Sequence, residues 1–149
     1  MFLGLQEVVA IFSFLRVSQD LDNLANNTSI PLVNQRIKSI LEEIAPEEIQ
    51  YFNAKVVCSD GILENSYYFL NVTYAIMCLD HEQSIYKKMS GEDDIVSFKR
   101  LVYRENCLNE LNIARDKEYV PHLLVSEKIK AIFTKEKITG IRFLCPENY

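Results

Sequence analysis

The feature that most constrains the fold of this 149-residue chain is a capped amphipathic helix that follows a short apolar run, a construction that the sequence uses twice. In the first copy Asn34 is the cap residue, because its side-chain oxygen can accept unpaired amide hydrogens of the first helical turn. Pro46 ends the helix, since the residue before a proline disfavours helical geometry. Between them the apolar residues recur at the spacing of one helix face: Ile37, Ile40, Leu41 and Ile44.

The second copy repeats this order near the C-terminus. Leu123–Val125 is the apolar run, Ser126 is the cap residue, and Gly140 marks the exit turn or C-terminal cap. Two copies are too few for a solenoid, so they are either two related lobes or two uses of one strand–helix–strand construction. The apolar face of the second helix carries Ile129, Ile132 and Phe133, and a strand is expected after each helix, at Tyr51–Cys58 and at Ile141–Cys145.

The stretch between the two helices predicts β-structure. Asp60-Gly61 is a turn dipeptide that leads from the first of these strands into the apolar run Tyr67–Leu79. That run is apolar on both faces, as expected of a strand buried on both sides, and its length predicts a bulge or a bend near Asn71. The remaining expectations are a short helix at Ser84–Met89, a polar turn at 90–94, a strand at Ile95–Tyr103, a helical turn at Asn106–Glu110 and a short strand at Leu111–Ala114.

The fold predicted from these elements is α+β, a twisted and mainly antiparallel sheet with two packed amphipathic helices. The composition, 48% apolar and 25% charged, is that of an ordinary globular protein, and 149 residues is close to the usual size of one domain. The sequence therefore predicts a single domain over residues 1–149.

The charge of the chain bears on its partners. The formal net charge is −5, and an acidic surface repels the phosphates of nucleic acids. The densest basic stretch, residues 128–137, is interleaved with Glu127 and Glu136, which is typical of a solvated helix face. The apolar N-terminal stretch contains Glu7 and lacks a signal-peptide cleavage site, and the run from Tyr67 is too short to cross a bilayer. These features predict a cytoplasmic protein that binds neither nucleic acid nor membrane.

The cysteines carry no motif. No two of them are close enough for a C-x-x-C site, and each lies in or beside an apolar run, where a free cysteine behaves as a small hydrophobic residue. This usage predicts free thiols in a reducing compartment, with two disulfides as the alternative. The four residues are Cys58, Cys78, Cys107 and Cys145.

Residues able to carry chemistry are few. His81 lies between Asp80 and Glu82, but adjacent side chains diverge on a strand or a helix, so a polar loop in which Asp80 caps the next turn is expected. His122 follows Pro121 and precedes an apolar run, which favours a packed or surface histidine. The sequence lacks the phosphate-loop, dinucleotide, nucleophile-elbow and zinc-protease motifs. It therefore predicts no catalytic residue, no cofactor and no metal.

Acidic clusters are the remaining polar feature. One cluster flanks Pro46 and the other occupies the predicted turn at 90–94. They are interpreted either as solubilising charge or as a negative patch that steers association with a basic partner and raises its on-rate. The candidate partner-binding residues are Glu42, Glu43, Glu47, Glu48, Glu92, Asp93 and Asp94.

Several segments of the chain are similar to those of one known family. Residues 123–132 read LLVSEKIKAI and residues 138–143 read ITGIRF, and earlier segments are Pro31–Val33, Tyr67–Asn71 and Cys78–Asp80 followed by Ser84. Together they resemble a bacterial immunity-protein family of polymorphic toxin systems. The resemblance covers roughly residues 28–145, and residues 1–27 lie outside it.

The resemblance implies a small protein that binds a cognate toxin in the producing cell and blocks its activity. It brings no catalytic residues, and such an inhibitor needs only a rigid surface of complementary shape and charge. Two other functions stay open from the residues alone. One is a protein-binding or scaffold module of another assembly, which strong self-association in the absence of a neighbouring toxin gene would favour. The other is an enzyme, which a deep pocket containing Asp80, His81, Glu82 or His122 would support. The oligomeric state is not predicted.

Overall fold

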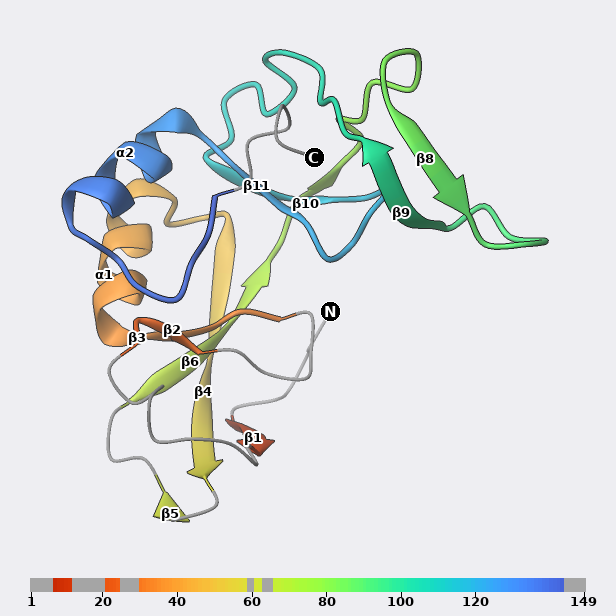
Figure 1. Ribbon diagram of the computed structural model, residues 1–149. Helices are drawn as coiled ribbons and strands as arrows, with labels where there is room; N and C mark the ends of the chain where they lie inside the picture. Colours follow the sequence, from red (N-terminus) through yellow and green to blue (C-terminus); the bar gives the residue numbers. More distant parts are fainter. Residues whose placement is uncertain (1–6, 12–20, 25–29, 59–60, 63–65, 144–149) are drawn as a thin grey trace.

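The main sheet gathers strands from the N-terminal half of the chain in the computed structural model, which describes residues 7–11, 21–24, 30–58, 61–62 and 66–143 (Figure 1). Strand β1 runs parallel to β4, and the other neighbours are antiparallel, with β5 pairing β4 outside the main order. The strands are β1 (Glu7–Ile11), β2 (Asn23–Leu24), β3 (Leu32–Asn34), β4 (Ile49–Cys58), β5 (Gly61–Ile62) and β6 (Tyr67–Val72), in the order β1-β4-β6-β3-β2.

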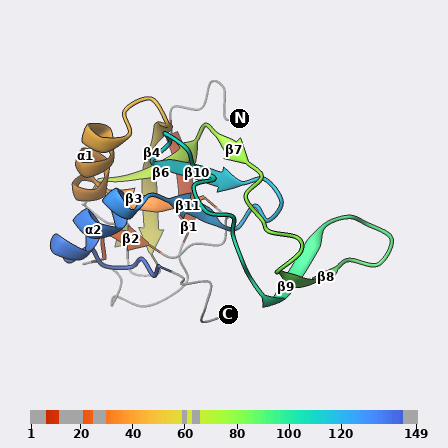
Figure 2. The ribbon, with the colours of Figure 1, turned by 90° about the horizontal axis from the view of Figure 1, so that it is seen from above.

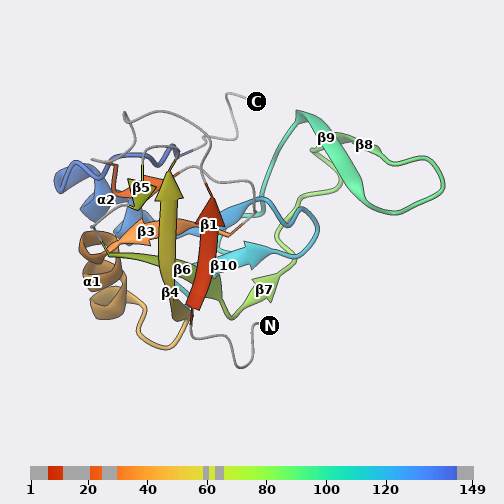
Figure 3. The same ribbon diagram turned by 90° about the horizontal axis from the view of Figure 1, so that it is seen from below.

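A smaller sheet and a hairpin follow in the C-terminal half. The smaller sheet has the order β11-β10-β7, in which β10 is antiparallel to β11 and parallel to β7. The hairpin β8–β9 projects away from both sheets (Figures 2 and 3). The strands are β7 (Ala75–Ile76), β8 (Ile85–Lys88), β9 (Ile95–Arg100), β10 (Ile113–Asp116) and β11 (Leu123–Val125). The predicted α+β class with mainly antiparallel strands is confirmed.

Both predicted helices form where their caps place them. Helix α1 (Gln35–Ile44) begins after Asn34, whose Oδ1 accepts a hydrogen bond from the Ile37 amide at 3.1 Å. Helix α2 (Glu127–Lys135) begins after Ser126, whose Oγ accepts one from the Ile129 amide at 3.4 Å. The apolar faces of the two helices meet in one core, which contains the buried residues Val33, Ile37, Leu41, Leu70, Ile129 and Phe133.

The long strand predicted at Tyr67–Leu79 is divided between the two sheets. Strand β6 ends at Val72, and the chain resumes as β7 beside β10, so the bend lies two residues beyond the predicted Asn71. The Thr73 amide still donates a hydrogen bond to the Glu48 carbonyl at 2.9 Å, in register with the β4–β6 ladder, so the chain leaves the main sheet after Thr73. The predicted burial on both sides holds for much of β6. It is wrong for residues 73–77, where Tyr74 and Met77 are exposed, whereas Cys78 and Leu79 are buried again.

Three smaller expectations are also corrected. The helix predicted at Ser84–Met89 is strand β8, because pairing with β9 and the contact of Tyr86 with Phe98 outweigh the local helical pattern. The strand predicted at Leu111–Ala114 is β10, which starts two residues later. Residues 141–143 belong to no strand, while 144–145 of the predicted strand Ile141–Cys145 and Asp60 of the predicted turn lie outside the described residues.

Two of the four cysteines are bonded to each other. Cys78 and Cys107 form a disulfide between the segment after β7 and the turn before β10, with their Cα atoms 5.5 Å apart. The prediction of free thiols is therefore wrong for this pair. Residues 29 positions apart in sequence leave no local pattern that would reveal their proximity.

Asp22 joins the N-terminal part of the chain to the turn that follows α2. Its Oδ2 accepts hydrogen bonds from the Thr139 amide at 2.8 Å and the Thr139 hydroxyl at 3.0 Å, and its Oδ1 accepts one from Asn34 at 2.7 Å. Burial alone raises the pKa of Asp22, but these hydrogen bonds, together with the nearby charge of Arg36, outweigh burial and lower that pKa. The buried carboxylate is thus stabilised in its charged form.

We expect the Asp22 carboxylate to make stability depend on pH. A carboxyl group whose pKa is lower in the folded state stabilises the fold above its unfolded pKa, about 3.9, and this contribution is lost as the pH falls through the folded value. Asp22→Asn should cost about 1–3 kcal/mol at pH 7, and the difference from wild type should shrink in acid. Urea unfolding from pH 7 to pH 3 measures it, with the fully exposed Asp93→Asn as the control. A difference that stays constant across this range would contradict the role of Asp22.

Gly140 is required where the exit turn of α2 meets the N-terminal segment. Its φ is +76°, and a Cβ atom at this position would lie 2.1 Å from the Asn23 carbonyl oxygen. The Asn23 amide also donates a hydrogen bond to the Thr139 carbonyl at 3.2 Å, so neither backbone can move away freely. Gly140 therefore permits the contact that closes the molecule.

A matched pair of glycine substitutions tests this contact. Gly91 has a similar φ of +80°, but no atom lies within 4 Å of the position that an added Cβ would take, so Gly91→Ala reports the backbone penalty alone, about 1–2 kcal/mol. Gly140→Ala should cost that much and a further ~1–3 kcal/mol for the steric overlap. Equal losses of unfolding free energy in the two variants would show that the close approach to Asn23 is not important.

Candidate functional site

The candidate acidic residues form two separate groups. Figure 1 shows α1 and the tip of the β8–β9 hairpin at opposite ends of the molecule, so the two groups do not make one patch. The first group lies at the end of α1 and in the turn before β4: Glu42, Glu43, Glu47 and Glu48. The second lies at the tip of the hairpin: Glu92, Asp93 and Asp94.

In the group near α1, two carboxylates already have partners. Glu48 Oε2 accepts hydrogen bonds from the amides of Asn112 and Ile113, both at 2.8 Å, and so holds the start of β10 against the end of α1. Glu42 forms an ion pair with Lys38 at 2.7 Å on the same helix. Glu43 and Glu47 are exposed. The Glu48 carboxylate is therefore structural, and this group offers less free negative charge than the sequence suggests.

The hairpin carries its acidic tip clear of the rest of the molecule (Figures 1 and 3). The Met89 amide donates a hydrogen bond to the Asp94 carbonyl at 2.9 Å and closes the turn, while Lys88 lies 3.5 Å from Asp93. All three tip carboxylates are exposed. Such a projecting and charged turn is well placed to meet another molecule.

The base of the hairpin is fixed to the body by several contacts. The Cys78–Cys107 disulfide joins the two chain segments that enter and leave this region. Next to it, the Arg104 amide donates a hydrogen bond to the Cys78 carbonyl at 2.8 Å, and Leu79 forms a β-bridge with Tyr103. A separate apolar cluster, built on Leu79, Ile95 and Leu101, lies beneath the hairpin. The tip is therefore presented on a firmly held arm, defined here as residues 79–103.

Both histidines of the chain lie where the arm meets the body. His81 bridges the two, because its ring nitrogens lie 2.8 Å from the Tyr86 hydroxyl on β8 and 2.8 Å from Glu118 Oε1 on the body. His122 stacks on Phe98 of β9, with the ring centroids 6.2 Å apart. Asp80 caps the turn as predicted, since its Oδ1 accepts hydrogen bonds from the next amides, Glu82 and Gln83.

Two part-buried hydrogen bonds connect His122 to the buried Asp116 through Tyr103. The Tyr103 hydroxyl donates to Asp116 Oδ2 at 2.6 Å and lies 2.9 Å from His122 Nδ1. Because a carboxylate can only accept, the tyrosine proton points to Asp116, and His122 must carry its own proton on Nδ1. Burial lowers the pKa of His122, and the charge of Asp116 opposes this only in part, so the imidazole is neutral at pH 7. These hydrogen bonds fix the orientation of the neutral His122 ring.

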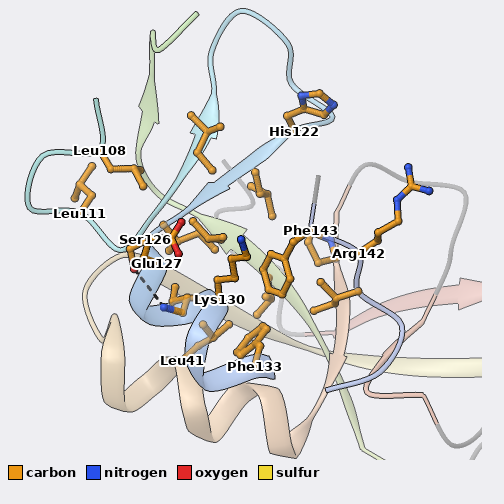
Figure 4. Close-up of a pocket in the computed structure, with 18 of the residues that line it drawn as sticks. Leu41, Leu108, Leu111, His122, Ser126, Glu127, Lys130, Phe133, Arg142 and Phe143 are labelled. Carbon is orange, nitrogen blue, oxygen red and sulfur yellow. Dashed lines mark hydrogen bonds between the residues drawn. The ribbon is translucent and has the colours of Figure 1, made fainter. Parts of the chain in front are cut away.

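An open cavity of about 1070 Å³ lies between the two helices, β11 and the segments around residues 104–111 and 140–143 (Figure 4). Its wall is largely apolar, and Phe133 and Phe143 lie side by side in it with ring centroids 6.2 Å apart. His122 lines one end, whereas Asp80, His81 and Glu82 do not line it. The cavity therefore does not gather the acid–base residues that an enzyme hypothesis would need from this loop.

The described part of the chain adds two observations on cofactors and membranes. It contains no group of three or more histidine, cysteine or acidic side chains arranged to hold a metal ion. None of its helices has the length and apolar character needed to cross a membrane.

A comparison with models of known protein families shows to which family the chain belongs. The family model described as "Immunity protein family (Imm11)" matches residues 6–145. The chain belongs to this family. The resemblance to an immunity-protein family seen in the sequence is thereby confirmed, and the match starts ahead of β1, which pairs with β4 in the main sheet. No curated protein matches the sequence.

The sequence alone did not reveal the polar network of Tyr103, Asp116 and His122. Asp116 is fully buried although it ends a short strand and precedes Lys117, which is typical of an exposed position. Its partners Tyr103 and His122 come from different segments, so no spacing connects the three. The sequence shows only that His81 comes two residues after the apolar run ending at Leu79 and that His122 comes directly after Pro121. Neither position identifies the residues that the histidine contacts.

We expect Tyr103→Phe to destabilise the fold. The substitution removes the hydroxyl that donates to the fully buried Asp116 carboxylate, and loss of a donor to a buried charged group costs about 1–3 kcal/mol. Chemical denaturation measures the change. Tyr74→Phe, at a side chain that is 47% exposed, is the matched control and should be nearly neutral. If the two variants were equally stable, the Tyr103–Asp116 hydrogen bond would contribute nothing.

Proposed function

We propose that this chain is a non-catalytic immunity protein that binds the cognate toxin of a polymorphic toxin system and neutralises it. The observation that carries the proposal is the family match over residues 6–145. Inhibition of this kind requires a surface that complements the toxin and no chemistry of its own.

The arm is our first choice for the toxin-binding surface. Its three tip carboxylates are exposed and project from the body, and the disulfide and the apolar cluster hold its base, so little conformational freedom would be lost on binding. An acidic tip would steer a toxin that presents a basic surface. Glu42, Glu43 and Glu47 remain candidate contacts, whereas Glu48 is already occupied by the amides of β10.

Action in the cytoplasm of the producing cell is part of this proposal. It is supported by the acidic composition and by what the resemblance implies. The Cys78–Cys107 disulfide weighs against it, because disulfides are typical of oxidising compartments. Thiol labelling of protein taken directly from its native host would distinguish a reducing from an oxidising location. If Cys78 and Cys107 do not react with the label, a reducing location is contradicted.

The proposal is tested with the product of the toxin gene expected next to the gene of this protein. Expression of that product alone should stop growth, and co-expression of this chain should restore it. If the neighbouring product is harmless, or if it stays toxic and does not bind this chain, the proposal is wrong.

Charge reversal tests the choice of surface. Asp93→Lys with Asp94→Lys should lower the affinity for the toxin by about tenfold or more, mainly through the association rate, and should weaken its salt dependence. The control is Glu105→Lys with Glu110→Lys, two exposed acids outside both groups that give the same change in net charge. Association rates measured by surface plasmon resonance at two salt concentrations distinguish them, and equal effects in both double variants would exclude the tip as the contact.

A further inference from the structure

The β8–β9 arm has two strand edges that differ in how they could meet another strand. Among the residues that the structure describes, β8 and β9 pair only with each other, so each strand has one edge with no strand beside it. Such an edge presents backbone N–H and C=O groups that can pair with a further strand. The arm projects away from both sheets (Figures 1 and 3).

Charge makes β8 a poor partner for a second copy of itself. Two strands related by a two-fold axis pair in antiparallel fashion. The adjacent residues Lys87 and Lys88, both exposed, would then lie against Lys87 and Lys88 of the other copy. Like charges directly opposite each other destabilise a pair of strands, and lysines are a common means of protecting an edge.

The charges along β9 have the opposite consequence. Two acids, Asp93 and Asp94, come immediately before the strand, and two cations, Lys99 and Arg100, end it. All four side chains are exposed. Within the described ranges, Asp94, Lys99 and Arg100 take part in no ion pair, and Asp93 has only the distant contact with Lys88 at 3.5 Å. One end of β9 is negative and the other is positive.

We propose that a second copy of this chain pairs with β9 along this edge, in antiparallel orientation about a two-fold axis. This orientation sets the acidic end of each β9 against the basic end of the other, so opposite charges meet at both ends of the contact. The axis passes near Val96 and Ser97, and the Val96 side chain, 42% exposed in one copy, becomes covered. The two arms then form a four-stranded sheet.

The ladder within the arm limits the strength of this contact. Its register shifts between Ile85 and Tyr86 and between Lys87 and Lys88, which gives β9 one extra residue at each place. Such bulges bend a strand and shorten the regular edge that it can offer. The dimer is therefore expected to be reversible and to depend on concentration and on salt.

The inference does not depend on the proposed toxin, because it is tested on the isolated protein. Sedimentation velocity from micromolar to near-millimolar concentration should show a monomer–dimer equilibrium for the full chain. Two double variants, Asp93→Lys with Asp94→Lys and Lys99→Asp with Arg100→Asp, should each dimerise at least about tenfold more weakly than the wild type and stay monomeric at micromolar concentration, because like charges then meet at both ends. Glu105→Lys with Glu110→Lys, the matched control for the first variant, should dimerise as the wild type does.

The mixture of the two double variants is the decisive measurement. One variant has four cations along β9 and the other has four acids, so an equimolar mixture should form a heterodimer although each alone is monomeric. Recovery of the dimer in the mixture would establish the antiparallel pairing. A wild-type chain that stays monomeric throughout, variants that dimerise as the wild type does, or a mixture that stays monomeric would each overturn the inference.

Discussion

The apolar core shared by α1 and α2 joins the two ends of the chain into one body. Ile37 and Leu41 of the first helix share one buried core with Ile129 and Phe133 of the second, although the helices are about ninety positions apart in sequence. Burial of four such side chains contributes several kcal/mol, about 1.5–3 each, which is as large as the whole stability margin of many domains. Asp22, Glu48 and Gly140 make further contacts around this core, and they join segments that lie on either side of the helices.

This arrangement separates the part that holds the fold from the part that can meet a partner. The body contains the shared core, whereas the arm contributes little to it and has its own small cluster at its base. The acidic tip is the candidate contact for the toxin, and the inferred dimer uses the same tip. Toxin binding and pairing of two arms would therefore exclude each other, so that self-association would lower the apparent affinity for the toxin at high protein concentration.

Local signals predicted the elements that depend on local interactions. Asn34 and Ser126 cap their helices through amides three residues away, and the spacing of Ile37 and Leu41 identified the buried face. The parts that failed depend on distant residues. Strand β8 forms by pairing with β9, and Cys78 is bonded to Cys107. The buried Asp116 carboxylate accepts a hydrogen bond from Tyr103, which lies in another segment. The sequence identified the residues of the two acidic groups. The distance between the groups and the structural role of Glu48 follow only from the tertiary fold.

The central proposal is that this member of the immunity-protein family acts by occupying a cognate toxin and not by altering it. A titration of the purified toxin with the chain, read by the toxin's own activity, tests it most directly. The account predicts that activity falls in proportion to added protein until a fixed molar ratio is reached. It also predicts that active toxin of unchanged mass is recovered when the complex is separated. Lasting inactivation of excess toxin by a small amount of this chain would show catalysis and contradict the claim, as would a toxin that remains fully active.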